Sequence, residues 1–154
     1  MGHEVTESSM RSLMRVAKNV RLCMETALAD AGASFADFAI LDAISVERGL
    51  SQRQIARRLS IEGPPLTRHL ERLEAEGLVT RRRDEHDRRV QRVYPTAAGS
   101  QLYATLCPIV ARLERDLLET IPAADAAAFA RVLSHLRTRL EAREPAEAEE
   151  RAAT

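Results

Sequence analysis

The fold is decided by residues 51–99, which read SQRQIARRLSIEGPPLTRHLERLEAEGLVTRRRDEHDRRVQRVYPTAAG. Ser51 precedes a short stretch in which apolar residues recur at helical spacing. Serine is a favourable N-cap residue. Two prolines follow at 64 and 65, and a helix tolerates them only in its first turn, where the backbone N–H groups have no helical partner. This second helix is expected to end at Gly77. The stretch therefore begins with two short helices joined by a turn.

Two extended segments follow these helices. Residues 78–83 and 90–95 contain β-branched side chains and flank a charged tip, Arg83 to Arg89. This arrangement is typical of a β-hairpin. A helix-turn-helix followed by a hairpin predicts a mainly α protein with a small β-hairpin wing, that is, a winged helix-turn-helix.

Long amphipathic helices are expected on both sides of this unit. Apolar residues recur every three or four positions from Met10 to Ala27, from Leu102 to Leu117 and from Phe129 to Leu140. Thr96 caps the second of these helices, and Pro108 should kink it. The predicted organisation is a DNA-binding domain over 34–96, a helical dimerisation region over 1–33 and 97–143, and a disordered tail over 144–154. These apolar stripes exceed what one small domain can cover, so a homodimer is expected, with a monomer carrying a helical cap as the alternative.

Charge is gathered in the same region. The chain has 23 basic and 23 acidic residues, but the segment from Arg48 to Arg92 has 12 basic and 7 acidic residues, a net charge of +5. Such a concentration suits phosphate binding. Aromatic residues make up 3 % of the chain, which leaves few rings for stacking on unpaired bases and therefore favours duplex DNA over RNA loops or single strands.

Candidate DNA contacts follow from this geometry. On the second short helix Arg68 is placed to reach a guanine edge and Arg72 a phosphate. At the hairpin tip Asp87 is expected to orient one arginine so that the other enters the minor groove. An ordinary charged surface is the alternative for both sets. The full candidate set is Ser51, Gln52, Arg53, Pro64, Pro65, Thr67, Arg68, Arg72, Arg81, Arg82, Asp87, Arg88 and Arg89.

At these residues the chain resembles the MarR family of winged helix-turn-helix regulators, over roughly residues 6–143, and its turn and wing look most like the SlyA-type branch. The matching text is Leu50-Ser51-Gln52, Ile55 to Leu59, Glu62-Gly63-Pro64, Leu70 to Val79, Asp87-Arg88-Arg89 and Thr96 to Gly99. Two positions depart from the pattern. Pro65 stands where the family often has a Ser or Thr hydroxyl, and Pro95 replaces the usual Leu.

The resemblance implies a dimeric repressor that leaves DNA when a small aromatic or phenolic acid binds between the dimer helices and the DNA-binding domain. Matching positions place Lys18, Arg21, Phe38 and His69 near that site, where cations and a ring could receive a carboxylated aromatic. Core packing or solvent exposure is the alternative role for each. A cysteine-based redox sensor is a second possibility, although Cys23 and Cys107 have the pattern of buried small hydrophobes.

Other function classes find little support in the sequence. The chain shows no nucleophile motif, no phosphate-binding glycine loop and no metal-ligand spacing among its histidines and cysteines, so no enzyme, metal or cofactor is expected. No apolar run approaches the length of a membrane span, and a soluble cytoplasmic protein is expected. A ligand-independent architectural DNA binder and a winged-helix protein-interaction module remain as alternatives.

Overall fold

The computed structural model describes residues 7–141 of the 154. The chain divides into two compact units, with the boundary between Leu113 and Glu114. The predicted tail, residues 144–154, lies outside the described residues.

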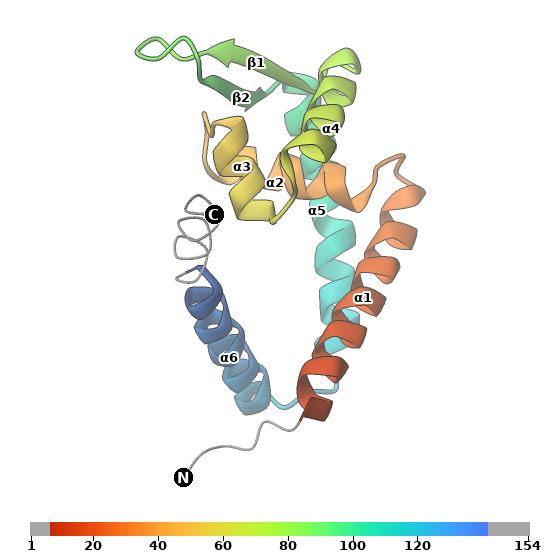
Figure 1. Ribbon diagram of the computed structural model, residues 1–154. Helices are drawn as coiled ribbons and strands as arrows, with labels where there is room; N and C mark the ends of the chain where they lie inside the picture. Colours follow the sequence, from red (N-terminus) through yellow and green to blue (C-terminus); the bar gives the residue numbers. More distant parts are fainter. Residues whose placement is uncertain (1–6, 142–154) are drawn as a thin grey trace. The chain divides into compact units, whose positions relative to one another are not determined.

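The described residues form six helices and one two-stranded antiparallel sheet, in the order that the sequence predicts (Figure 1). The elements are α1 Glu7–Ala29, α2 Phe35–Val46, α3 Gln52–Leu59, α4 Gly63–Ala75, β1 Val79–Arg83, β2 Gln91–Pro95, α5 Ala97–Leu118 and α6 Ala123–Glu141. The fold class is therefore confirmed. None of the described helices is long and apolar enough to cross a bilayer.

Local side-chain caps fix where α2, α3 and α5 begin. Ser34 and Asp37 form a capping box at α2, with hydrogen bonds of 3.1 and 2.9 Å. Ser51 and Gln54 repeat it at α3, at 3.2 and 2.8 Å. At α5 the Thr96 hydroxyl accepts from the N–H of the third helical residue at 3.0 Å. Each cap contributes about 1 kcal/mol.

The main core lies between α2, α3, α4 and the hairpin. Leu66, Leu70 and Leu73 form the buried face of α4, as their spacing predicts, and all three are fully buried. Val79 of β1 and Val93 of β2 complete this core from the sheet side. Burial of each such leucine contributes about 1.5–3 kcal/mol to the stability of the fold. The opposite face of α4 is therefore held toward solvent.

The hairpin is joined to the start of α3. Its strands pair antiparallel from Val79 opposite Pro95 to the charged tip. The Val93 N–H donates to the Leu50 carbonyl at 2.9 Å, and a β-bridge follows at the next residue. The segment before α3 therefore pairs with β2 through an isolated bridge and fixes the hairpin against the helix-turn-helix.

The start of α5 packs tightly against the chain between α4 and β1. Gly99 is buried, and a Cβ atom at this position would lie 1.9 Å from the Leu78 carbonyl oxygen. The Thr96 hydroxyl donates to the Gly77 carbonyl at 2.7 Å. A side chain at residue 99 would therefore separate α5 from the wing. Farther along, α5 continues through Pro108.

A second core joins α1, α2 and α5 around Leu28, Ala33 and Leu106. Elsewhere on α1, large apolar side chains are exposed, among them Met14 at 69 % and Leu22 at 55 %. The expectation that Cys23 is buried is wrong, because it lies on this exposed part of α1, beside a shallow hollow of about 390 Å³. Cys107 is half-buried.

Unit two contains α6, whose apolar side chains are also exposed. Phe129 is 50 % and Leu140 62 % exposed in the single chain. The amphipathic pattern predicted for this segment is therefore realised as a helix with an uncovered apolar face.

Candidate nucleic-acid interface

The turn between α3 and α4 is held by a side-chain hydrogen bond. Gln52 Nε2 donates to Thr67 Oγ1 at 2.5 Å, and this hydroxyl donates to the Gly63 carbonyl at 3.0 Å. Both Gln52 and Thr67 are candidate DNA contacts, and in this structure they bind each other. The bond links the first turn of α3 to the first turn of α4, where the prolines at 64 and 65 occupy the expected N-terminal positions.

Arg68 lies on the exposed face of α4, away from the buried leucines. Within the described residues its guanidinium has no ion-pair or hydrogen-bond partner, which leaves all five N–H donors available. This is the geometry required of a residue that reaches a base edge or a phosphate.

Arg72, one turn later, is bound to two carboxylates. Its guanidinium pairs with Asp37 of α2 and, at 3.0 Å, with Glu76. Burial lowers the pKa of Arg72, but the hydrogen bonds and charges of Glu76 and Asp37 outweigh this and raise it above its usual value. Arg72 therefore links α4 to α2, and it would reach a phosphate only by rearranging these contacts.

Arg81 is held in the same way against α4. Its Nε and Nη2 donate to Glu74 Oε2 at 2.8 and 2.6 Å, and its backbone N–H donates to Oε1 at 3.0 Å. The hydrogen bonds from Arg81 lower the pKa of Glu74. The Arg81 side chain is 20 % exposed, so its main contact in this structure is the joint between β1 and α4.

Asp84 organises the hairpin tip, a role that the sequence reading missed. Its Oδ1 accepts from the backbone N–H groups of His86 and Asp87, each at 2.9 Å, and its Oδ2 pairs with the Arg92 guanidinium. The hydrogen bond from Arg92, followed by those from the two backbone groups, lowers the pKa of Asp84 to about 2. Aspartate at the start of a turn commonly accepts from the next backbone groups, and that local signal was available.

Asp87 shapes the backbone of the tip. Its carboxylate accepts from the Arg89 N–H at 3.0 Å, and its carbonyl accepts from the Val90 N–H at 2.9 Å. Among the described contacts the carboxylate binds this backbone group and no guanidinium. Any positioning of Arg88 and Arg89 by Asp87 therefore acts through the turn, and both arginines extend into solvent.

The candidate DNA contacts as a whole divide into an exposed set and a half-buried set. The exposed set is Arg53, Pro64, Arg68, Arg72, Arg82, Asp87, Arg88 and Arg89. The half-buried set is Ser51, Gln52, Pro65, Thr67 and Arg81. Ser51 caps α3 with its side chain, so its hydroxyl is already used within the protein. The exposed set belongs to α3, α4 and the hairpin, which together form one winged helix-turn-helix.

The candidate ligand residues have separate surroundings. Lys18 and Arg21 are exposed on α1, and His69 is half-buried on α4. Phe38 stacks on Tyr103 with ring centroids 6.0 Å apart. Neither of the two cavities described here is lined by any of these four residues.

The partner of Phe38 is itself anchored. The Tyr103 hydroxyl donates to Asp42 Oδ1 at 2.7 Å, and this bond raises the pKa of Tyr103. The Phe38 ring therefore rests on a fixed aromatic neighbour where α2 and α5 meet.

Comparison with known proteins identifies a family and solved structures to which this chain is similar. Residues 31–90, which include α2, α3, α4, β1 and the hairpin tip, match the model of the MarR family. The chain is similar to the transcriptional regulator BldR of Sulfolobus solfataricus, at 25 % identity and a TM-score of 0.78, over 92 % of this chain and 99 % of that one.

Two further solved structures share the fold. One is a MepR–DNA complex of S. aureus, with 20 % identity and a TM-score of 0.74 over 90 % of this chain and 99 % of that one. The other is BpsR of Bordetella bronchiseptica, whose DNA binding is regulated by 6-hydroxynicotinic acid, with 21 % identity and a TM-score of 0.77 over 85 % and 99 %. Together the comparisons show a fold that is shared with these regulators, and a match to the MarR family over residues 31–90.

Proposed function

We propose that the chain is a transcriptional regulator of the MarR family that binds duplex DNA as a homodimer, with the turn and wing of the SlyA-type branch. The observation that carries this proposal is the division among its arginines. Arg72, Arg81 and Arg92 are paired with carboxylates inside the fold. Arg68 on α4 and Arg88 and Arg89 at the hairpin tip are exposed and have no carboxylate partner among the described residues.

The arginines between Arg68 and Arg92 therefore have two different roles. The paired arginines hold α2, α4 and the hairpin together. The unpaired ones supply cations at the two parts of a winged helix that reach the major and minor grooves. A solvated surface alone does not require such a separation. The MepR–DNA complex, which has the same fold, supports DNA as the partner.

The exposed apolar residues support the dimer. Side chains on α1 and α6 remain uncovered in the single chain, including Met14, Leu22, Phe129 and Leu140. We assign residues 1–33 and 97–143 to the dimer contact and residues 34–96 to DNA binding. A two-fold dimer carries two DNA-binding domains, so the operator is a pseudo-palindrome with half-sites about 10 base pairs apart.

Regulation by a small aromatic acid is the second part of the proposal. The DNA binding of BpsR is regulated by 6-hydroxynicotinic acid. In this chain the resemblance to the MarR family points to Lys18, Arg21, Phe38 and His69 for such an acid. Binding of the acid would release the protein from its operator, as expected of a repressor. Its proposed place of action is the cytoplasm.

The exposure of Cys23 favours a second regulatory function, a redox response at this thiol. Peroxide should then weaken operator binding by the wild type and leave a Cys23→Ser variant unaffected. Equal responses of the two proteins would reject this alternative.

The DNA-binding proposal is tested by selecting duplexes from a random-sequence pool and measuring affinity for the selected duplex and for a scrambled one. Wild type should prefer the selected duplex. Arg68→Ala should lose about 1–3 kcal/mol on the selected duplex and much of the preference at one base pair. If no duplex is retained at low salt, DNA binding is refuted. If Arg68→Ala weakens both duplexes equally, its role in base reading is wrong.

A further inference from the structure

The start of α4 offers few backbone donors to an anion. The first turn of a helix normally exposes N–H groups that have no helical partner, and such groups commonly bind phosphate. In α4 the prolines at 64 and 65 have no N–H, so Gly63 carries the one donor among the first three helical residues. Leu66, the fourth, already donates to the Glu62 carbonyl at 3.2 Å. The exposed Glu62 side chain adds negative charge at the same end, so capture of a phosphate by the backbone of α4 is disfavoured.

The Thr67 hydroxyl fixes which atom of the Gln52 amide faces it. The hydroxyl proton is used on the Gly63 carbonyl, at 3.0 Å. Toward Gln52 the hydroxyl can therefore only accept, so the amide nitrogen and not the amide oxygen must face it, at 2.5 Å. This nitrogen has two N–H groups, and the contacts of the described residues use one of them. The second N–H of Gln52 is available for the oxygen of a ligand.

The residues next to this pair favour an anion as that ligand. Arg53 follows Gln52 on α3, Arg68 follows Thr67 on α4, and both arginine side chains are exposed. Among the residues that the structure describes, neither guanidinium has an ion-pair or hydrogen-bond partner. Gln52 and Thr67 themselves are half-buried. A neutral donor that is held in place is therefore flanked along the chain by two unpaired cations.

We propose that Gln52 binds a DNA phosphate through its second amide N–H and so supplies the donor that the prolines remove from the start of α4. Thr67 is a positioning residue, because its hydroxyl holds the amide nitrogen and has no proton left for the phosphate. This assignment separates two residues that the sequence predicts as equivalent DNA contacts. It rests on the proposed DNA binding and adds a neutral phosphate contact to the cations of α3 and α4.

Methylphosphonate substitution tests this contact one phosphate at a time. The selected duplex is prepared with a single neutral methylphosphonate at successive positions, and its affinity for each protein is measured. Gln52→Ala should bind the unmodified duplex about tenfold more weakly than wild type, as expected for one lost hydrogen bond to a charged acceptor. At one phosphate of each half-site, the loss caused by methylphosphonate should be at least about fivefold smaller in Gln52→Ala than in wild type. Gln101→Ala makes the same change at an exposed position on α5 and should behave as wild type.

Two further measurements separate phosphate binding from a structural role. Thr67→Val removes the hydroxyl and should reduce the loss at the same phosphate, whereas Thr67→Ser keeps the hydroxyl and should behave as wild type. The slope of log affinity against log salt should be the same in Gln52→Ala as in wild type, because a neutral amide releases no counterion. Chemical denaturation shows that each variant is folded.

Three results would each overturn the inference. Gln52→Ala could be as sensitive as wild type to every neutral phosphate, which would mean that Gln52 only holds α3 against α4. Its salt slope could fall, which would mean that a charged contact is lost. Thr67→Val could keep the wild-type response at the phosphate in question. In all three cases the protein still binds the duplex and the proposed function stands, whereas a wild-type protein that binds no duplex refutes both.

Discussion

The carboxylate of Asp37 on α2 holds the guanidinium of Arg72 on α4. Asp37 is 4 % exposed and is the buried charged residue of the described chain. The same carboxylate accepts from the Ser34 N–H at 2.9 Å and so also caps α2. At the neighbouring residue, the Phe35 N–H donates to Glu25 of α1 at 2.9 Å. Hydrogen bonds through the start of α2 therefore connect α1 to α4.

Asp37→Asn should lower the free energy of unfolding by about 1–3 kcal/mol, because a charged hydrogen-bond acceptor is lost in a buried place. Chemical denaturation measures this loss. Glu71→Gln is the matched control, since it neutralises an exposed carboxylate on α4 and should stay within about 0.5 kcal/mol of wild type. Equal stability of the two variants would show that Asp37 does not hold α4.

Gly99→Ala should lower stability by about 1–3 kcal/mol or more, because its Cβ would lie 1.9 Å from the Leu78 carbonyl oxygen and backbone must move. Gly63→Ala makes the same chemical change where nothing lies within 4 Å and should be close to neutral. Thermal unfolding compares them. A Gly99→Ala protein as stable as Gly63→Ala would mean that α5 does not pack on the wing as described.

The hairpin tip should resist acid. Because the pKa of Asp84 is lowered to about 2, its ionised form stabilises the folded tip. This stabilisation is complete above the ordinary aspartate pKa of about 4 and is lost as the pH falls through about 2. The amide NMR signals of His86 and Asp87 should titrate with a midpoint near 2. A midpoint near 4 would show that Arg92 and the tip amides do not bind this carboxylate.

Two acidic residues of the tip should have opposite effects on DNA binding. Asp87→Ala removes the acceptor for the Arg89 N–H and should weaken binding about 2- to 10-fold, the equivalent of one ordinary hydrogen bond. Glu85→Ala removes the same charge from an exposed side chain without such a contact and should bind DNA slightly more tightly. Titrations with one duplex compare the two. Tighter binding by Asp87→Ala would mean that its carboxylate only repels phosphate.

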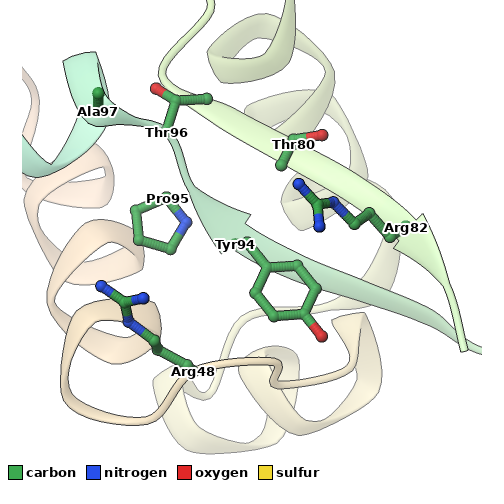
Figure 2. Close-up of a pocket in the computed structure, with 7 residues that line it drawn as sticks. All are labelled: Arg48, Thr80, Arg82, Tyr94, Pro95, Thr96 and Ala97. Atoms are coloured by element: carbon green, nitrogen blue, oxygen red, sulfur yellow. The ribbon is translucent and has the colours of Figure 1, made fainter.

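The sequence could predict whatever depends on neighbours in the chain. The caps at Ser51 and Thr96 and the hairpin all follow from residues within a few positions of one another, and all are confirmed. Asp37, one partner of Arg72, and Glu74, the partner of Arg81, lie on other elements, so only packing decides that these cations are used inside the fold. The cavity that Arg48, Arg82 and Tyr94 help to line likewise lies where separate parts of the chain meet (Figure 2).

The exposure of Cys23 could not be predicted for a different reason. The apolar pattern of α1 predicts that one face of the helix is buried. It does not show whether the same chain or a second copy buries that face. In the single chain that face is open. Sedimentation at micromolar concentration should therefore give a species of twice the chain mass of 17.1 kDa, and a single-chain species would contradict the dimer.

The most direct test of DNA binding by the winged helix is the salt dependence of duplex affinity for wild type and for Arg88→Ala/Arg89→Ala. Each phosphate contact contributes about 0.9 to the slope of log affinity against log salt. The double variant should lose at least about tenfold in affinity at low salt and about 1 to 2 units of slope. Arg58→Ala removes a guanidinium that pairs with Glu47 at 3.2 Å and should change both far less. A double variant with the wild-type affinity and slope would contradict the account.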